Sequence, residues 1–377
     1  MSIDNIGLAF SGGGFRAATF ALGSLSYLQR LHLQGKPLLQ RVSFISSTSG
    51  GSLTNAFYTL RLYQGQEPAS IFKELYAHLS GDQILERALA CLTNPAAWAA
   101  YPHKTRNLIN AFAITYDQIL FEGKTMEVFW NKARQPHVEE VCFNSTELNN
   151  GISFRFRTNG TDADIVSFGN YYLGFKKESV DALRSLRIAD MVAASSCFPV
   201  GFEPIVFPND FAAGEQTPAS LLEAFEFDHN DALRRDEVQT LAFGLIDGGV
   251  VDNQGLYSLG LEDNLRPPLH ARKAGLDAQA DAGKAGARPF DLLIACDVAS
   301  YFLDPYAVPS ESSAWLLRIQ LKWIVIALAM IVPLTAVTVG IFAARHEPWY
   351  YYLLLLPAYL SSGLIGLGFW KMAKALR

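Results

Sequence analysis

The sequence predicts an α/β fold in which helices cover a mostly parallel central sheet. Two short apolar runs, Ile6–Phe10 and Val42–Ser47, are each followed by a glycine-containing turn and then by apolar residues at spacings of three and four. This order of strand, turn and helix is typical of α/β layers, because each helix must bury one apolar face against the sheet. Half of the 377 residues are hydrophobic, which is enough to build a large core.

The later elements follow the same pattern less regularly. Residues 66–141 are mostly helical in pattern, and their aromatic-rich part from Trp98 to Phe121 predicts either a cap over a site or outer helices. A helix is expected to end near Ala194. Residues 271–289 are polar, rich in Ala and Gly and aperiodic, which favours a flexible surface loop. Further strands are predicted at Ile152–Arg157, Ala242–Ile246 and Phe290–Ala295.

Residues 314–377 differ from the rest of the chain. They contain two uncharged stretches, 323–344 and 348–370, each long enough to cross a hydrocarbon core of about 30 Å as a helix. Only three residues separate them, and Trp and Tyr residues lie at their ends, where interfacial aromatics are expected. We therefore predict a membrane hairpin that anchors a domain formed by residues 1–313. The alternative is a pair of buried core helices.

Charge predicts the orientation of this hairpin and the class of partner. Basic residues flank its outer ends, so the positive-inside bias places the domain and the C terminus on the cytoplasmic side of an integral membrane protein. Residues 314–377 hold six basic residues and one acidic residue, out of chain totals of 31 and 36. The remaining 25 basic and 35 acidic residues leave the domain acidic, which argues against nucleic acid as its main partner.

The four cysteines are widely separated and lie mostly in apolar segments, so we expect reduced, buried thiols and no structural zinc.

The first motif is the glycine-rich turn after Ile6–Phe10. Gly12, Gly13 and Gly14 fit a dinucleotide-binding pattern, yet no acidic residue stands between Asp4 and Glu67 to hold a ribose, and no Gly-Lys-Ser/Thr follows the glycines. The alternative is an oxyanion hole, in which bare amides and a helix N-terminus face a developing negative charge. Arg16, two residues on, is expected either to contact a phosphate group or to brace the loop.

A serine nucleophile is the second candidate. Ser49 lies between a strand and a helix, with the small residues Ser47 and Gly51 two positions before and after it, as a nucleophile elbow requires. The usual elbow has glycine where Ser47 stands. The competing interpretation is a Ser/Thr cap at the N-terminus of the second helix.

A serine hydroxyl needs a base, and the seven histidines lie in no motif built for that role. Asp247 ends an apolar strand and precedes Gly248 and Gly249, so its carboxylate is the candidate base. The competing interpretation is an ordinary Asp-Gly turn.

Three stretches in this order, GGGFRA, STSGG and DGGVVDNQGL, resemble the patatin-like phospholipases, and residues 193–199 (AASSCFP) resemble a further segment of that family that supports the site. The likeness spans residues 6–300. It implies a three-layer α/β sandwich and a Ser-Asp dyad, with Ser49 as nucleophile, Asp247 as base and the amides of Gly12, Gly13 and Gly14 as the oxyanion hole. Ser47 departs from the family pattern, and the membrane hairpin is no part of it.

The resemblance implies a membrane-anchored acyl hydrolase that cleaves phospholipid or lysophospholipid esters through an acyl-enzyme. No cofactor or metal is expected, and no Asp/Asn-rich calcium loop is present in the sequence. The expected partners are membrane phospholipids as substrate and the bilayer through the hairpin. Two alternatives remain, namely a catalytically silent membrane scaffold or lipid-binding module, and a serine esterase of soluble substrates.

Overall fold

The computed structural model describes residues 3–130, 136–158, 168–170, 173–175, 179–227, 242–266 and 288–298, together with residues 337, 339, 341, 344 and 345. The chain divides into two compact units, Met1–Ala299 and Ser300–Arg377. The predicted division at residues 313 and 314 stays a prediction. The first unit carries the sheet, the glycine turn, the serine elbow and Asp247.

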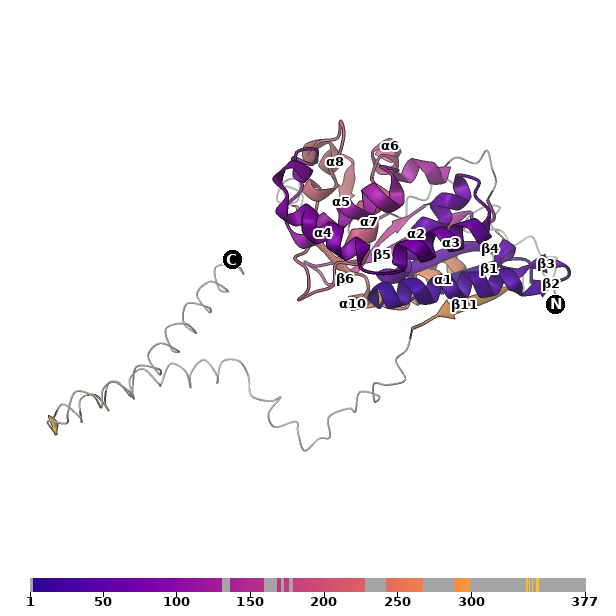
Figure 1. Ribbon diagram of the computed structural model, residues 1–377, viewed down its shortest axis with the longest axis horizontal. Coiled ribbons are helices and arrows are strands. Elements are labelled where there is room, and N and C mark those ends of the chain that lie inside the picture. Colours follow the sequence, from indigo (N-terminus) through magenta and orange to yellow (C-terminus); the bar gives the residue numbers. More distant parts are fainter. Residues whose placement is uncertain are drawn as a thin grey trace. The chain divides into compact units, whose positions relative to one another are not determined.

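The first unit is built on a seven-stranded sheet whose path is β11-β1-β4-β5-β10-β8, with β6 paired to β5 (Figure 1). β11, β1, β4 and β5 run parallel, β10 and β6 are antiparallel to β5, and β8 is antiparallel to β10. Five of these described strands therefore point the same way, which confirms the predicted α/β fold with a mostly parallel sheet. The strands are β1 (Ile6–Phe10), β4 (Val42–Thr48), β5 (Glu140–Glu147), β6 (Ile152–Arg157), β8 (Ile205–Phe207), β10 (Phe243–Asp247) and β11 (Leu292–Cys296).

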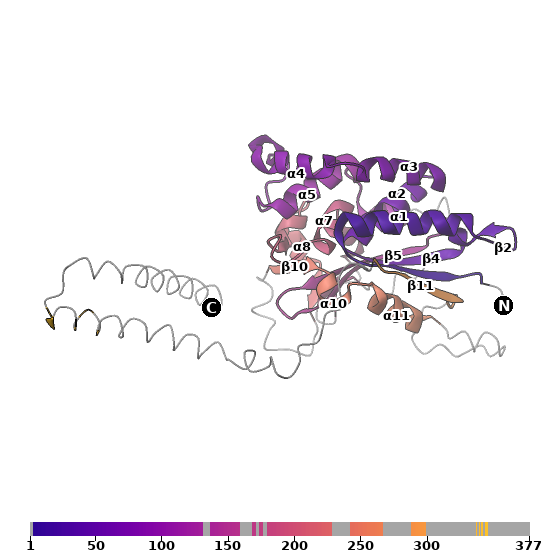
Figure 2. The same ribbon diagram turned by 60° about the horizontal axis from the view of Figure 1, so that its bottom comes forward.

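Helices cover both faces of the sheet. Figure 2 shows α1 (Gly14–Arg30), α2 (Gly50–Tyr63) and α3 (Pro68–Leu79) on one face and α11 (Leu256–Leu265) on the other. Every residue of α2 except Leu62 is buried, because α2 lies between the sheet and its neighbouring helices. The remaining helices include α4 (Gln83–Thr93), α5 (Leu108–Tyr116), α6 (Val180–Arg184), α7 (Ile188–Ser195), α8 (Pro218–Glu223) and α10 (Gly249–Asp252). Two short antiparallel pairs complete the described strands, β2–β3 (His32–Leu33, Lys36–Pro37) and β7–β9 (Leu173–Phe175, Phe225–Phe227), and bridges through Gly169 connect β7 to β6.

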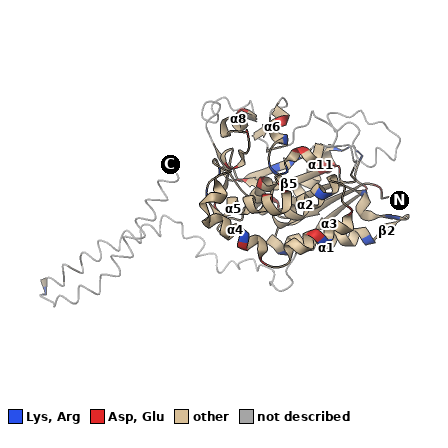
Figure 3. Ribbon diagram, turned by 45° about the horizontal axis from the view of Figure 1, so that its top comes forward, with Lys and Arg blue, Asp and Glu red and all other residues tan. Residues whose placement is uncertain are grey.

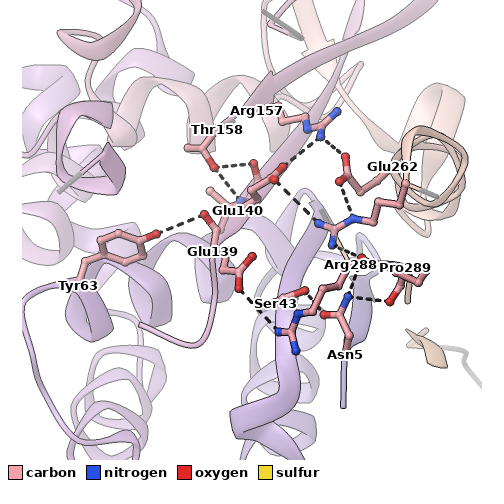
Figure 4. Close-up of polar contacts among 12 residues, drawn as sticks. Asn5, Ser43, Tyr63, Glu139, Glu140, Arg157, Thr158, Glu262, Arg288 and Pro289 are labelled. Atoms are coloured by element: carbon pink, nitrogen blue, oxygen red, sulfur yellow. Dashed lines mark hydrogen bonds and ion pairs between the residues drawn. The ribbon is translucent and has the colours of Figure 1, made fainter. Parts of the chain in front are cut away.

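A buried ionic cluster fastens α11 to the sheet (Figure 4). Arg157 at the end of β6 pairs with Glu140 at 3.0 Å and with Glu262 of α11, and Glu262 also accepts from Arg266 at 2.8 Å. Arg266 in turn donates to the backbone oxygen of Arg288 at 2.9 Å. Two arginines and two glutamates balance their charges there, so that none is buried without an opposite partner. The cluster thus links Arg266 to the backbone of Arg288. The predicted loop 271–289 lies mostly outside the described residues.

The cysteines are free thiols and most of them are buried, as the sequence predicts. Basic and acidic residues are interspersed over the described elements (Figure 3). All four cysteines are free, with Cys91, Cys142 and Cys197 buried and Cys296 half-buried. Burial raises the pKa of the Cys142 thiol to about 11 and that of Cys197 to about 12, so both remain protonated and unreactive near neutral pH.

None of the helices within the described residues is both long and apolar enough to span a bilayer. The predicted spans 323–344 and 348–370 lie almost entirely outside the described residues.

His137 makes the stability of the fold depend on pH. Its Nδ1 lies 2.8 Å from the carbonyl of Val42, to which it donates, so Nε2 is left to accept from the Tyr58 hydroxyl at 2.8 Å. Burial lowers the pKa of His137 from 6.5 to about 4. Because the unfolded chain binds this proton more readily, stability is fully present above pH 6.5 and falls as the pH drops toward 4, by about 3 kcal/mol in all.

The measurement is the free energy of unfolding in urea between pH 7.5 and 4, compared with His137→Gln and with the exposed His103→Gln. The parent and the His103 variant should lose stability together, while the His137 variant should lose about 3 kcal/mol less across the same range. Parallel curves for all three proteins would contradict the assignment.

Candidate active site

Two glycine turns pack against each other at the ends of β1 and β4. Gly13 and Gly14 start α1 with φ of +136° and +64°, a region that favours glycine. Ser49 stands between β4 and α2 with φ 52° and ψ −124°, which is a strained backbone for a residue with a side chain. A Cβ on Gly50 would lie 1.8 Å from the carbonyl oxygen of Gly14, and one on Gly51 would lie 2.7 Å from the Cβ of Phe10. The elbow therefore requires bare backbone at both positions after Ser49.

The contact between Gly50 and Gly14 yields a stability prediction. Gly50→Ala is expected to destabilise the fold by roughly 3 kcal/mol or more, because its methyl group would overlap a backbone oxygen that cannot rotate away. Gly23→Ala on α1 is the matched control, since a Cβ there meets nothing within 4 Å. That control should stabilise the protein by about 0.5–1 kcal/mol. Equal melting temperatures for both variants would contradict this close approach of the two turns.

Strand register brings the end of β10 to the elbow. On β5, Asn144 pairs with Thr48, the residue before Ser49, and the next residue, Ser145, pairs with Asp247. The ends of two strands that are about 200 residues apart therefore meet at one point on β5. The pairing of β4 and β10 with β5 therefore brings Ser49 and Asp247 together, although the sequence could identify each of them only as a separate candidate.

Asp247 is held firmly and largely out of water. Its backbone N–H donates to the carbonyl of Cys197 at 2.8 Å, and its carboxylate accepts from the N–H of Gly249 at 2.6 Å. The Ser49 side chain lies near enough to this carboxylate to lower its pKa. Burial raises the pKa of Asp247 above that of an ordinary carboxyl group, and the hydrogen bond from Gly249 and the Ser49 side chain partly oppose this rise. A desolvated carboxylate with a serine side chain beside it is the kind of group that can act as a general base.

Ser195, the last residue of α7, joins the two halves of the site. Its hydroxyl accepts from the N–H of Ser49 at 3.0 Å and donates to the carbonyl of Asn144 at 2.6 Å. Its own carbonyl accepts from the N–H of Gly248 at 3.3 Å. The segment 193–199 thus contacts both the elbow and the turn after Asp247, as its likeness to a supporting segment led us to expect. The particular part played by Ser195 was missed, because a buried serine at the end of a helix shows no sequence pattern.

Ser47 departs from the usual elbow glycine for a visible reason. Its hydroxyl donates to the carbonyl of Cys142 at 3.2 Å and accepts from Ser52 at 3.1 Å and Asn55 at 2.9 Å. The side chain therefore points into a buried polar network beneath the elbow and leaves the approach to Ser49 clear.

A cavity of about 500 Å³ opens over Ser49 and Asp247. α5 contributes Ile109, Phe112 and Tyr116 to it, so the aromatic-rich region whose role the sequence left open does border the site. Ser49 and Asp247 are among its few polar lining residues, and most of the wall is apolar. The lining residues are Gly13, Gly14, Phe15, Ser49, Gly50, Leu53, Ile109, Phe112, Tyr116, Ser196, Phe198, Pro199, Phe202, Asp247, Gly249, Val250 and Asn253.

The glycine amides differ in what they already contact. The N–H of Gly12 donates to the carbonyl of Asn253 at 2.8 Å, so its one hydrogen is taken. Within the described part of the chain, the N–H groups of Gly13 and Gly14 donate to no protein acceptor, as is usual at a helix N-terminus. Both of these glycines line the cavity, and Gly12 does not. The predicted oxyanion hole is therefore open at Gly13 and Gly14 only.

Three further predictions concern groups other than Ser49 and Asp247. Arg16 is exposed at the start of α1, and no described residue accepts a hydrogen bond from its side chain. No histidine is among the residues that line the cavity. Among the described residues, no three His, Cys, Asp or Glu side chains are grouped as metal ligands.

Comparisons with known proteins bear on the whole of this site. A search of the curated proteins found no match. Among solved structures, human GIVD cytosolic phospholipase A2 matches at 14% identity and a TM-score of 0.38, over 68% of this chain and 44% of that chain. The family model for patatin-like phospholipases matches residues 8–259, which is more than half of the chain and includes Ser49, Asp247 and the glycine turn. The chain belongs to the patatin-like phospholipase family.

Proposed function

We propose that this protein is a lipid acyl hydrolase that cleaves phospholipid or lysophospholipid esters through Ser49 and Asp247. The observation that carries the proposal is that Ser49 and the buried Asp247, whose pKa the Ser49 side chain lowers, line the same largely apolar cavity. Apolar walls suit an acyl chain, and the strained elbow presents the serine to it. Family membership supports the same class of reaction.

In the proposed reaction Asp247 takes the proton of Ser49 while the serine oxygen forms a bond to the ester carbonyl carbon. The carbonyl oxygen becomes an oxyanion that the N–H groups of Gly13 and Gly14 and the N-terminus of α1 stabilise. The ester C–O bond then breaks, and the proton on Asp247 passes to the departing alcohol oxygen. Water attacks the acyl-enzyme with Asp247 again as base, which releases the fatty acid and restores Ser49.

The test is fatty-acid release from phosphatidylcholine vesicles by the purified full-length chain in the presence of a chelator. A fluorophosphonate, which esterifies activated serines, should abolish release and leave its adduct on the peptide that contains Ser49. Release that survives complete labelling would refute the proposal. Hydrolysis of short water-soluble esters without release from vesicles would favour the soluble esterase, and no hydrolysis with retained vesicle binding would favour the silent scaffold.

We also propose that residues 323–344 and 348–370 anchor the enzyme as a membrane hairpin, with the catalytic unit on the cytoplasmic side. Their length, lack of charge and flanking basic residues support this. Such tethering would raise the local concentration of lipid at the active site. Extraction of the full chain from membranes by alkaline carbonate would refute the anchor, whereas release only by detergent would support it.

A further inference from the structure

Exposed apolar side chains surround the cavity mouth. We call Phe15, Phe198, Val200, Val250 and Val251 the collar; they are 41%, 62%, 105%, 53% and 44% exposed. Phe15, Phe198 and Val250 also line the cavity, and Val200 and Val251 lie within two residues of Phe198 and Val250 along the chain. Three segments that are distant in sequence therefore present apolar groups around one opening. Single exposed apolar residues are common, but a group contiguous with a binding cavity marks an interaction surface.

Val200 is the most unusual member of the collar. It is fully exposed, and its φ is 73°, a conformation that β-branched residues rarely adopt. The turn around it is set by Cys197, Pro199 and Gly201: the Sγ of Cys197 donates to the carbonyl of Glu203 at 3.1 Å, and the N–H of Gly201 donates to the carbonyl of Phe198 at 3.2 Å. The fold thus exposes the apolar side chain of Val200 to water and holds its backbone in an unfavourable conformation. Neither feature favours valine at this position.

The charges of the collar segments point to the kind of surface that covers it. The stretches 13–16, 198–201 and 248–251 contain no acidic residue and one basic residue, Arg16. Arg16 is exposed at the same end of α1 as Phe15, and no described residue accepts a hydrogen bond from it. An apolar ring with an exposed cation beside it matches a lipid surface, where acyl chains lie beneath a layer of phosphates.

We propose that the collar is a membrane-docking surface that seats the cavity mouth on the bilayer, so that a lipid passes from the bilayer into the cavity without crossing water. This inference rests on the proposed function for its substrate, but docking itself requires no hydrolysis. It explains why the apolar wall of the cavity continues outward to Phe198 and Val250, since a mouth that takes only dissolved substrates gains nothing from an apolar rim.

Docking is tested by a reporter at the collar. A polarity-sensitive fluorophore is attached to Val200→Cys in the full-length Ser49→Ala chain and mixed with phosphatidylcholine vesicles that carry doxyl-labelled lipid. The same fluorophore on Tyr76→Cys, 64% exposed on α3, is the matched control, and the chain without added cysteine gives the background. We expect a blue shift and quenching at position 200 and neither at position 76. Equal signals at the two positions, or none at position 200, would overturn the proposal.

Catalysis supplies an independent measurement. Val200→Gly combined with Val251→Ser removes two collar side chains that do not line the cavity, and glycine suits the backbone at position 200. Release from vesicles should fall about tenfold or more, while hydrolysis of a dissolved short-chain ester stays unchanged. Tyr76→Ser should alter neither rate. An equal fall on both substrates, or a fluorescence change that follows protein rather than lipid concentration, would overturn docking in favour of a distorted site or a second copy of the chain.

Discussion

Ser49→Ala is expected to lower fatty-acid release from phospholipid vesicles by about 10³-fold or more, because it removes the atom that forms the acyl-enzyme. The fold should survive this change. The N–H of Ser49 keeps its bond to Ser195, and the Cβ remains where it is. The measurement is the rate of release at saturating lipid beside the melting temperature of each protein.

Ser49→Gly is the companion variant. The backbone at position 49, with φ 52° and ψ −124°, is more accessible to glycine than to any residue with a Cβ, so this variant should be more stable than the parent by about 1 kcal/mol. It should also be as inactive as Ser49→Ala. If both variants are inactive and Ser49→Gly is more stable than the parent, the strained backbone at position 49 is retained because the reaction needs the serine hydroxyl. An active glycine variant would place the nucleophile elsewhere.

The parts of the fold that followed from the sequence are those with a local cause. β1 and β6 have the bounds that were predicted, because β1 is a continuous apolar run and β6 alternates apolar and polar residues. β10 and β11 were predicted to within about one or two residues, the usual uncertainty of a strand end. α7 ends one residue beyond the predicted Ala194.

β5 was missed, and its start was assigned to a helical region. All eight of its residues are buried, yet Glu140, Asn144, Ser145, Thr146 and Glu147 are polar. A strand of this kind has no apolar period, because its polar groups are satisfied by remote partners: Arg157 for Glu140, Ser258 for Asn144 and Ile246 for Ser145. The same reason hides Ser195. A sequence shows that a residue is polar, but only the fold shows which groups it meets.

The candidate site was easier to predict than the network under it, since a nucleophile elbow constrains its own neighbours. Gly50 and Gly51 must be small because of contacts that lie within the two turns themselves. Local constraints of this kind did not predict the contact that Gly12 makes. Its position in the motif suggested an oxyanion donor, but Asn253, which lies 241 residues later, takes its hydrogen.

Asp247→Asn is the prediction that separates a base from a structural carboxylate. Asparagine keeps the shape and an oxygen that can accept from Gly249, but it loses the negative charge and the capacity to take a proton. The rate of release is expected to fall about 10²–10⁴-fold, the range for loss of a general base. In the parent, activity should fall as the pH drops through the pKa of Asp247, which burial raises above the ordinary carboxyl range. The residual activity of the variant should lack this acidic limb.

Asp247→Asn is expected to lower activity without lowering the stability of the fold. Because the pKa of Asp247 is raised on folding, the stability linked to this group is present at low pH and is lost as the pH rises through the raised value. A neutral asparagine carries no such loss, so the melting temperature of the variant at neutral pH should equal or exceed that of the parent. A structural carboxylate predicts the reverse, a less stable protein with its activity retained. A less active protein that is no less stable is the result expected where a fold accepts an unfavourable charge because the chemistry requires it.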